Sequence, residues 1–134
     1  MQITRQADYA VRAVLYLAKL GPDQRAATSQ IAKNQKIPSS SLAKIISQLS
    51  IAKLIETNRG ARGGVVLARP ASEISLLEVV EAIDGPIELN ECTASPGRCE
   101  NADNCPLHEI WQEVQDELVS KLRSTTFDKY AQKK

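Results

Sequence analysis

The sequence predicts a mainly helical protein with one small β-hairpin. Three observations lead to this fold class. Up to Leu54 the chain contains three helical patterns separated by short turns. A glycine-rich segment between two β-prone runs follows, and a long amphipathic helix comes near the end of the chain. A chain of 134 residues is long enough for one domain, or for one small domain with an appendage.

Two helices are predicted before residue 38. The first begins after Thr4, whose hydroxyl can cap it, and Gly21 stops it. The second is short: it begins at Thr28 or Ser29, and Lys36-Ile37-Pro38 breaks it.

The third predicted helix covers residues 39–54 and begins at Ser39 or Ser40. After it, a hairpin is predicted whose glycine-rich tip carries Arg59 and Arg62. The inward face of the third helix consists of Leu42, Ile45, Ile46 and Leu49.

Two further helices are predicted in the second half. Ser75 and Glu78 form a capping-box pattern at the start of helix 76–84. The last helix begins near Pro106, and its apolar stripe needs a surface to cover it. The tail from Thr125 is expected to be frayed. The stripe consists of Leu107, Trp111, Val114, Leu118 and Leu122.

Charge is divided unequally along the chain. Residues 1–69 contain 11 Lys and Arg against 3 Asp and Glu, a net charge of +8, whereas residues 70–134 contain 6 against 13, a net charge of −7. The basic half is therefore expected to meet a polyanion, although a chance imbalance of solvated faces is the alternative.

Three helices followed by a basic hairpin is the order of a winged helix-turn-helix, in which the third helix enters the major groove of DNA. An arginine on a glycine-rich hairpin can lie in the minor groove. The alternative is a solvated hairpin with two incidental arginines. The predicted DNA-contacting residues are Ser39, Ser40, Ser41, Lys44, Arg59 and Arg62, with Lys36 close to them.

All three cysteines lie in one segment, as Cys92-x6-Cys99-x5-Cys105, and the only histidine, His108, follows. Zinc sites usually bring paired CxxC ligands, which are missing here, so widely spaced thiolates favour an iron–sulfur cluster. A zinc site that includes His108, a thiol switch without a metal, and incidental cysteines remain alternatives. The cysteines supply only three ligands, so a fourth must come from elsewhere.

The compartment and the oligomeric state can also be anticipated. No apolar run approaches the ~18 residues of a membrane span, and the charged N-terminal segment does not fit a signal peptide, so a cytoplasmic protein is expected. Because DNA readers commonly pair to match two half-sites, a homodimer built on the last helix is expected.

Several segments resemble the IscR/NsrR-type bacterial winged-helix iron–sulfur transcriptional regulators, and the resemblance covers essentially the whole chain. It rests on TRQADYAVRAVLYLA, IPSSSLAKIISQL, RGARGGVVLARP, ISLLEVVEAIDGP and the cysteines ending in CPLHEIW. One departure is the first gap between cysteines, which is six residues here and five in the usual family pattern.

The resemblance implies a dimeric regulator whose cluster state changes its affinity for palindromic promoter DNA. It implies Cys92, Cys99 and Cys105 as ligands of a 2Fe-2S or 4Fe-4S cluster. Asp8 from the partner chain is the preferred fourth ligand, and His108 is the alternative. The expected division is a winged helix-turn-helix domain over 1–70 and a cluster loop with a dimerisation helix over 71–134.

A function of a different class is an iron–sulfur enzyme or electron carrier. No catalytic constellation supports an enzyme, and such a protein would leave the basic hairpin without a role. Control of transcription by redox state, nitric oxide, iron or cluster supply is the expected type of regulation. The sequence leaves open the particular signal and whether the protein is a repressor or an activator.

Overall fold

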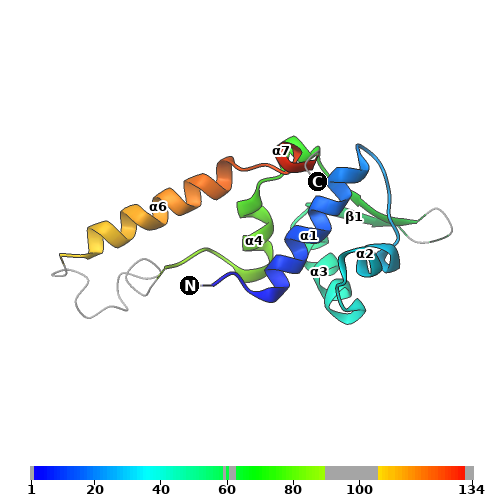
Figure 1. Cartoon of the computed structure of the whole chain (residues 1–134), viewed down its shortest axis with the longest axis horizontal. Coiled ribbons are helices and arrows are strands. Elements are labelled where there is room, and N and C mark those ends of the chain that lie inside the picture. The colour runs from blue at the N-terminus through cyan, green and yellow to red at the C-terminus, as the bar shows by residue number, and fades with distance from the viewer. Residues whose placement is uncertain (1, 59, 61–62, 90–105, 132–134) are drawn as a thin grey trace.

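The computed structural model describes residues 2–58, 60, 63–89 and 106–131, and its elements follow the predicted order (Figure 1). The predicted fold class, mainly α with a β-hairpin wing, is confirmed. The elements are α1 (Arg5–Leu20), α2 (Thr28–Gln35), α3 (Ser39–Ile51), β1 (Ile55–Asn58), β2 (Gly64–Leu67), a 3₁₀ turn (Ala71–Glu73), α4 (Leu76–Asp84), α6 (His108–Ser124) and α7 (Asp128–Ala131).

The central helix of the body is α1, which contacts α2, α3, α4, α7 and β2. The Thr4 hydroxyl accepts a hydrogen bond from the Ala7 N–H at 3.1 Å, as the sequence predicts for a capping residue. Gly21 ends the helix with a φ of 103°. The side chains buried along α1 are mostly small: Ala7, Ala10, Ala13, Val14, Leu17 and Ala18.

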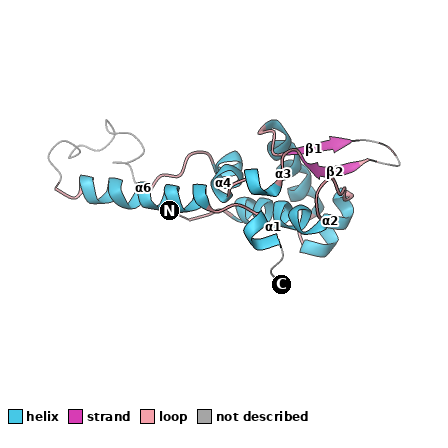
Figure 2. Ribbon diagram, turned by 90° about the horizontal axis from the view of Figure 1, so that it is seen from above, coloured by secondary structure: helices cyan, strands magenta, loops and turns pink. Residues whose placement is uncertain are grey.

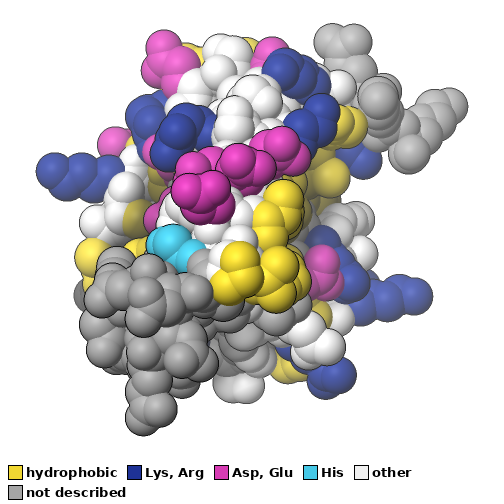
Figure 3. Space-filling model, turned by 90° about the vertical axis from the view of Figure 1, so that its left-hand side faces the viewer, with side chains coloured by type: hydrophobic (Ala, Val, Ile, Leu, Met, Phe, Trp, Pro, Cys, Tyr) yellow, Lys and Arg dark blue, Asp and Glu magenta, His cyan; other side chains and the backbone are white. Residues whose placement is uncertain are grey.

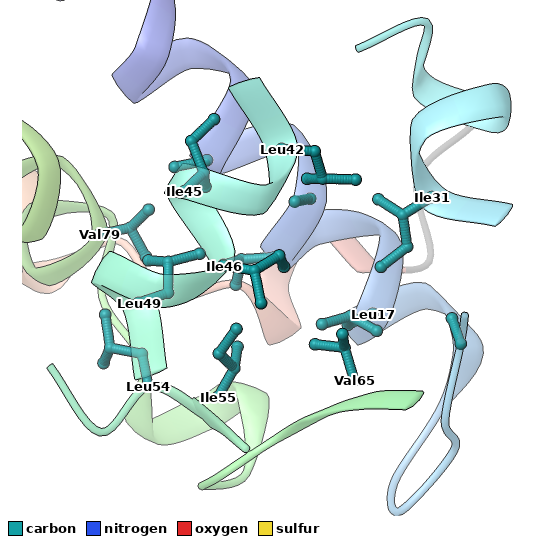
Figure 4. Packing of buried hydrophobic residues seen from close by; sticks show 14 of the residues in the cluster. Leu17, Ile31, Leu42, Ile45, Ile46, Leu49, Leu54, Ile55, Val65 and Val79 are labelled. Atoms are coloured by element: carbon teal, nitrogen blue, oxygen red, sulfur yellow. The ribbon is translucent and has the colours of Figure 1, made fainter. Parts of the chain in front are cut away.

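A tight turn joins α2 to α3. Lys36 turns the chain with a left-handed backbone, φ 56° and ψ 46°, and Ile37 is buried in the turn. The helix α3 ends at Ile51, before the predicted Leu54, because Lys53 is also left-handed and the Leu54 N–H bonds the Leu49 carbonyl at 3.0 Å. Figure 4 shows the predicted inward face of α3 packed in the core: Leu42, Ile45, Ile46 and Leu49.

The wing is an antiparallel pair in which Ile55 faces Leu67 and Asn58 faces Gly64. Ala26 adds a bridge to this hairpin, since its N–H donates to the Val65 carbonyl at 3.0 Å and its carbonyl accepts from the Val65 N–H at 2.8 Å. Gly64 is required at this place, because its φ is 141° and a Cβ would lie 2.9 Å from the Ala26 carbonyl oxygen.

The helix α4 begins with the predicted capping box between Ser75 and Glu78. The helix α6 runs away from the body, so that only its C-terminal part lies near α4 (Figures 1 and 2). That part packs through Leu118, Val119 and Leu122 against a small cluster of buried residues, Leu77, Val80 and Ile87.

The expectation of a frayed tail is wrong for residues 125–131. The Phe127 side chain is 5% exposed, and its N–H donates to the Ile74 carbonyl at 3.2 Å. The Leu76 N–H donates to the Thr125 carbonyl at 2.8 Å, and α7 follows. Phe127 and Val79 belong to the same hydrophobic core as the buried residues of α1 and α3. Both regions expected from the sequence, 1–70 and 71–134, therefore contribute to one core.

Candidate DNA interface and ligand segment

The N-terminus of α3 lies at the surface. Ser39, Ser40 and Lys44 are exposed. Pro38, which precedes the helix, makes no side-chain hydrogen bond to cap it. Amide groups at the start of a helix attract anions because they lack partners within the helix. This end of α3 therefore combines hydroxyl, ammonium and amide groups that suit DNA phosphates and base edges.

Ser41 has different surroundings from the two serines before it. It is half-buried, and its Oγ accepts a hydrogen bond from Gln6 Nε2 of α1 at 3.4 Å. The predicted DNA-contacting residues of α3 thus lie together on its first two turns. Among them, Ser41 is the one that is hydrogen-bonded to a side chain of α1.

The connection between β1 and β2 carries Arg59 and Arg62, both of which lie outside the described residues. The flanking described residues fix where that connection starts and ends, because Asn58 and Gly64 are register partners. The Gly63 N–H donates to the Gly60 carbonyl at 2.9 Å.

Arg25 is a basic residue near the wing that the sequence did not single out. It is exposed and directly precedes Ala26, which pairs with β2. With the Asn58 amide oriented to suit its neighbours, the Asn58 oxygen accepts hydrogen bonds from the Arg25 guanidinium. Only the division of charge along the chain hinted at this residue, because the pairing of Ala26 with β2 is a long-range contact.

Cys92, Cys99 and Cys105 lie outside the described residues, but both ends of their segment are described. The Leu89 N–H, three residues before Cys92, donates to Gln115 Oε1 of α6 at 3.0 Å. His108, three residues after Cys105, begins α6. Both ends therefore lie against α6, about two turns apart, with Cys92 and Cys105 each close in sequence to one of them.

The two candidates for the fourth ligand have contrasting surroundings. Asp8 is half exposed on the first turn of α1, and its Oδ2 pairs with Arg12 Nη2 at 2.7 Å. His108 is half-buried, and its Nδ1 is buried without a hydrogen-bond partner in the described part of the chain. A buried imidazole nitrogen without a partner can ligate a metal ion or hydrogen-bond to another group that does. Among the described residues, no group of three or more His, Cys, Asp or Glu side chains is placed so that it could hold a metal ion.

The projecting part of α6 carries an uncovered apolar surface. Figure 3 shows hydrophobic side chains beside the histidine at this end of the molecule. The sequence placed Leu107, Trp111 and Val114 on the stripe but missed Ile110. The four side chains are 54%, 41%, 40% and 46% exposed, respectively. Within the described ranges, no helix is long and apolar enough to cross a membrane.

A family model described as an iron-dependent transcriptional regulator, Rrf2, matches residues 3–133. The chain belongs to the Rrf2 family. Protein aau3 of Rhizobium meliloti (strain 1021) is 35% identical over 129 residues, which cover 96% of this chain and 83% of that protein. The HTH-type transcriptional regulator IscR of Photorhabdus laumondii is 30% identical over 128 residues, which cover 96% of this chain and 77% of that protein.

Solved structures agree with this membership in the Rrf2 family. CymR, the global cysteine regulator of B. subtilis, is 25% identical with a TM-score of 0.79, and the match covers 98% of this chain and 96% of that one. The IscR of T. potens is 23% identical with a TM-score of 0.73, covering 96% and 85%, and shows the fold alone. The Rrf2 chain is therefore a transcriptional regulator and not an enzyme, as the sequence predicted.

Proposed function

We propose that the chain is a DNA-binding transcriptional regulator of the cytoplasm whose affinity for palindromic promoter DNA is set by an iron–sulfur cluster bound to Cys92, Cys99 and Cys105. The observation that carries the proposal is the anchoring of the cysteine segment on α6 at both ends, by the Leu89–Gln115 hydrogen bond and by His108. The similarity to IscR and the family description as iron-dependent support it.

The residues at the end of the segment fit such a group. Three thiolates need one further ligand, and the buried His108 Nδ1, which has no partner among the described residues, fits that need. Asp8, which the sequence favoured as the fourth ligand, becomes the alternative, since its half-exposed carboxylate could reach the site of a partner subunit if its pair with Arg12 opened. When bound, an iron–sulfur cluster supplies redox and nitric-oxide sensitivity.

The protein works as a homodimer in this proposal. The exposed apolar side chains of α6 pair two subunits, so the helix that anchors the cysteine segment also sets the distance between the two α3 helices. A signal changes DNA affinity only if the cluster-bound and cluster-free dimers differ in the distance between the two α3 helices, or in how widely that distance varies.

The test is anaerobic purification followed by iron and sulfide analysis. Cys92→Ala, Cys99→Ala and Cys105→Ala should each lower the iron content strongly, while the proteins remain dimeric on a sizing column. Ser95→Ala, in the same segment, is the matched control and should keep its iron. Unchanged iron in all three cysteine variants would overturn the ligand assignment.

The same experiment separates the alternatives. Stoichiometric zinc in place of iron indicates a zinc site, and a metal-free protein that alters its DNA affinity on thiol oxidation indicates a thiol switch. An iron-containing protein that binds no DNA in any state indicates an electron carrier.

A further inference from the structure

Gln6 occupies an unusual place between α1 and the N-terminus of α3. Its Nε2 donates to Ser41 Oγ at 3.4 Å. Its Oε1 is buried and accepts no hydrogen bond in the described part of the chain. The amide is therefore only half satisfied, although it lies in an interface between two helices.

A half-satisfied amide is a poor way to stabilise such an interface. Burying an acceptor without a partner costs free energy that an apolar side chain of similar size would not cost. Stabilisation of the helix interface thus does not explain a glutamine at this position. We therefore look for a functional role for its hydrogen bond to Ser41.

Gln6 lies in the first turn of α1, and hydrogen bonds join the start of this helix to α4. Two residues earlier, Thr4 caps α1 and bonds the Asp84 carboxylate of α4, through its backbone N–H at 3.3 Å and its hydroxyl at 2.5 Å. The first turn of α1 is thereby fixed to α4, and a side chain from that turn can hold a group on α3 in a defined place.

We propose that Gln6 is a positioning residue for sequence-specific DNA recognition, acting through Ser41. An amide N–H that donates to Oγ occupies one lone pair of the hydroxyl, so the hydroxyl proton of Ser41 is turned away from Gln6. Ser41 then presents a donor to acceptors on DNA, such as a phosphate oxygen or guanine O6. This inference rests on the proposed DNA-reading role of α3 but is independent of the cluster.

The experiment uses the whole 134-residue chain and a duplex that the unaltered protein selects from a random-sequence pool, with a scrambled duplex of equal length for comparison. The variants are Gln6→Leu, Ser41→Ala and the double variant. Gln30→Leu is the matched control, because Gln30 Nε2 also donates to a hydroxyl on another helix, that of Tyr16 at 2.8 Å, but not to α3.

Gln6→Leu is expected to lower the preference for the selected over the scrambled duplex by roughly tenfold, with an unchanged or raised unfolding midpoint. In the Ser41→Ala background the same change should have little further effect. Gln30→Leu should keep the preference of the parent.

Three results would overturn the inference. One is a parent-like preference in Gln6→Leu. Another is an equal loss from Gln6→Leu with and without Ser41. The third is a loss of preference that accompanies a lower unfolding midpoint in Gln6→Leu, since it indicates a structural role alone. If the unaltered protein selects no sequence from the pool, the proposed function itself fails, and the inference fails with it.

Discussion

Glu78 joins the start of α4 to Arg69, which follows β2, and to the capping residue Ser75 through its two carboxylate oxygens. Its Oε1 accepts from the Ser75 backbone N–H at 3.4 Å and from the Ser75 hydroxyl at 3.3 Å, and its Oε2 accepts from Arg69 Nη2 at 2.5 Å. Burial alone would raise the pKa of Glu78, but the hydrogen bonds from Arg69 and Ser75 and the charge of Arg69 outweigh it and lower the pKa below its ordinary 4.5.

A carboxylate with a lowered pKa in the folded state stabilises the protein above its unfolded-state pKa. This contribution is lost as the pH falls from about 4.5 through the lower folded-state value. Glu78→Gln should reduce the free energy of unfolding at pH 7 by less than about 1 kcal/mol, because the pair with Arg69 is partly exposed. The difference from the parent should shrink below pH 4.5.

Urea unfolding between neutral and acidic pH measures this difference. The control is Glu81→Gln on the same helix, since Glu81 forms no ion pair in the described part of the chain. Equal pH dependence in the two variants would contradict the role assigned to Arg69 and Ser75.

The fourth ligand of the proposed cluster depends on two residues, Asp8 and His108. From the sequence Asp8 was preferred, but the structure shows Asp8 paired with Arg12 and His108 with a buried nitrogen that lacks a partner in the described ranges. We therefore expect His108→Ala to change the visible spectrum and to speed cluster loss in anaerobic, freshly reconstituted protein, and Asp8→Ala to do so less. A larger change in Asp8→Ala would instead indicate a ligand that crosses between subunits.

Among the elements, the wing depends most on contacts distant in sequence. Ala26 pairs with β2, Gly64 allows that pairing, and Arg25 bonds Asn58 once the Asn58 amide is oriented to its neighbours. These contacts brace the strands on both sides of the connection that carries Arg59 and Arg62.

The arginines of that connection should therefore act on DNA and not on the fold. Arg59→Ala and Arg62→Ala should each weaken DNA binding and flatten its salt dependence by up to about one unit in the log–log slope, with an unchanged unfolding midpoint. Binding titrations at several salt concentrations measure both quantities. Lys121→Ala on the exposed surface of α6 is the control. If the arginine variants bind DNA with the same affinity and salt dependence as this control, the wing does not contact DNA.

A second element, α6, has a surface that needs a partner. Ile110 and Trp111 are 46% and 41% exposed on the part of the helix that runs away from the body. Ile110→Glu should dissociate the proposed dimer, because a carboxylate would be buried without a partner at the interface. Glu113→Ala, on an exposed polar position, should leave it intact.

Sedimentation or light scattering, together with circular dichroism, measures this outcome. The monomer should keep its helix content, since the main core contains no residue of α6. An Ile110→Glu protein that is still dimeric would place the interface elsewhere.

At the scale of the whole molecule, the wing and the projecting end of α6 lie at opposite ends (Figure 1). Between them, α1 contacts α3 on one side and α4 on another, and the last turns of α6 pack on α4. A change at the cysteine segment and a change at the DNA surface can therefore be connected through a few packed helices.

How much of this the sequence predicts depends on the range of the contacts. The Thr4 cap and the Ser75–Glu78 capping box were correctly anticipated because each is made within three or four residues. The burial of Phe127, the pairing of Ala26 with β2 and the bond from Gln6 to Ser41 were missed, because each joins segments far apart in the chain.

In the candidate site, too, the local features were predicted and the long-range contacts were missed. The serines and Lys44 follow from the position of α3, whereas the anchoring of Leu89 by Gln115 spans 26 residues and has no local signal. The roles of the cysteines and wing arginines stay predictions.

The central claim is that the cluster controls DNA affinity, and binding of one selected duplex by the dimer with and without its cluster tests it most directly. Both forms should be prepared without oxygen at the same salt concentration, the second by chelation, with dimer content checked in each. We expect affinities that differ by roughly tenfold or more. Equal affinities for the two dimers, with iron analysis confirming that one is loaded and the other empty, would contradict the claim.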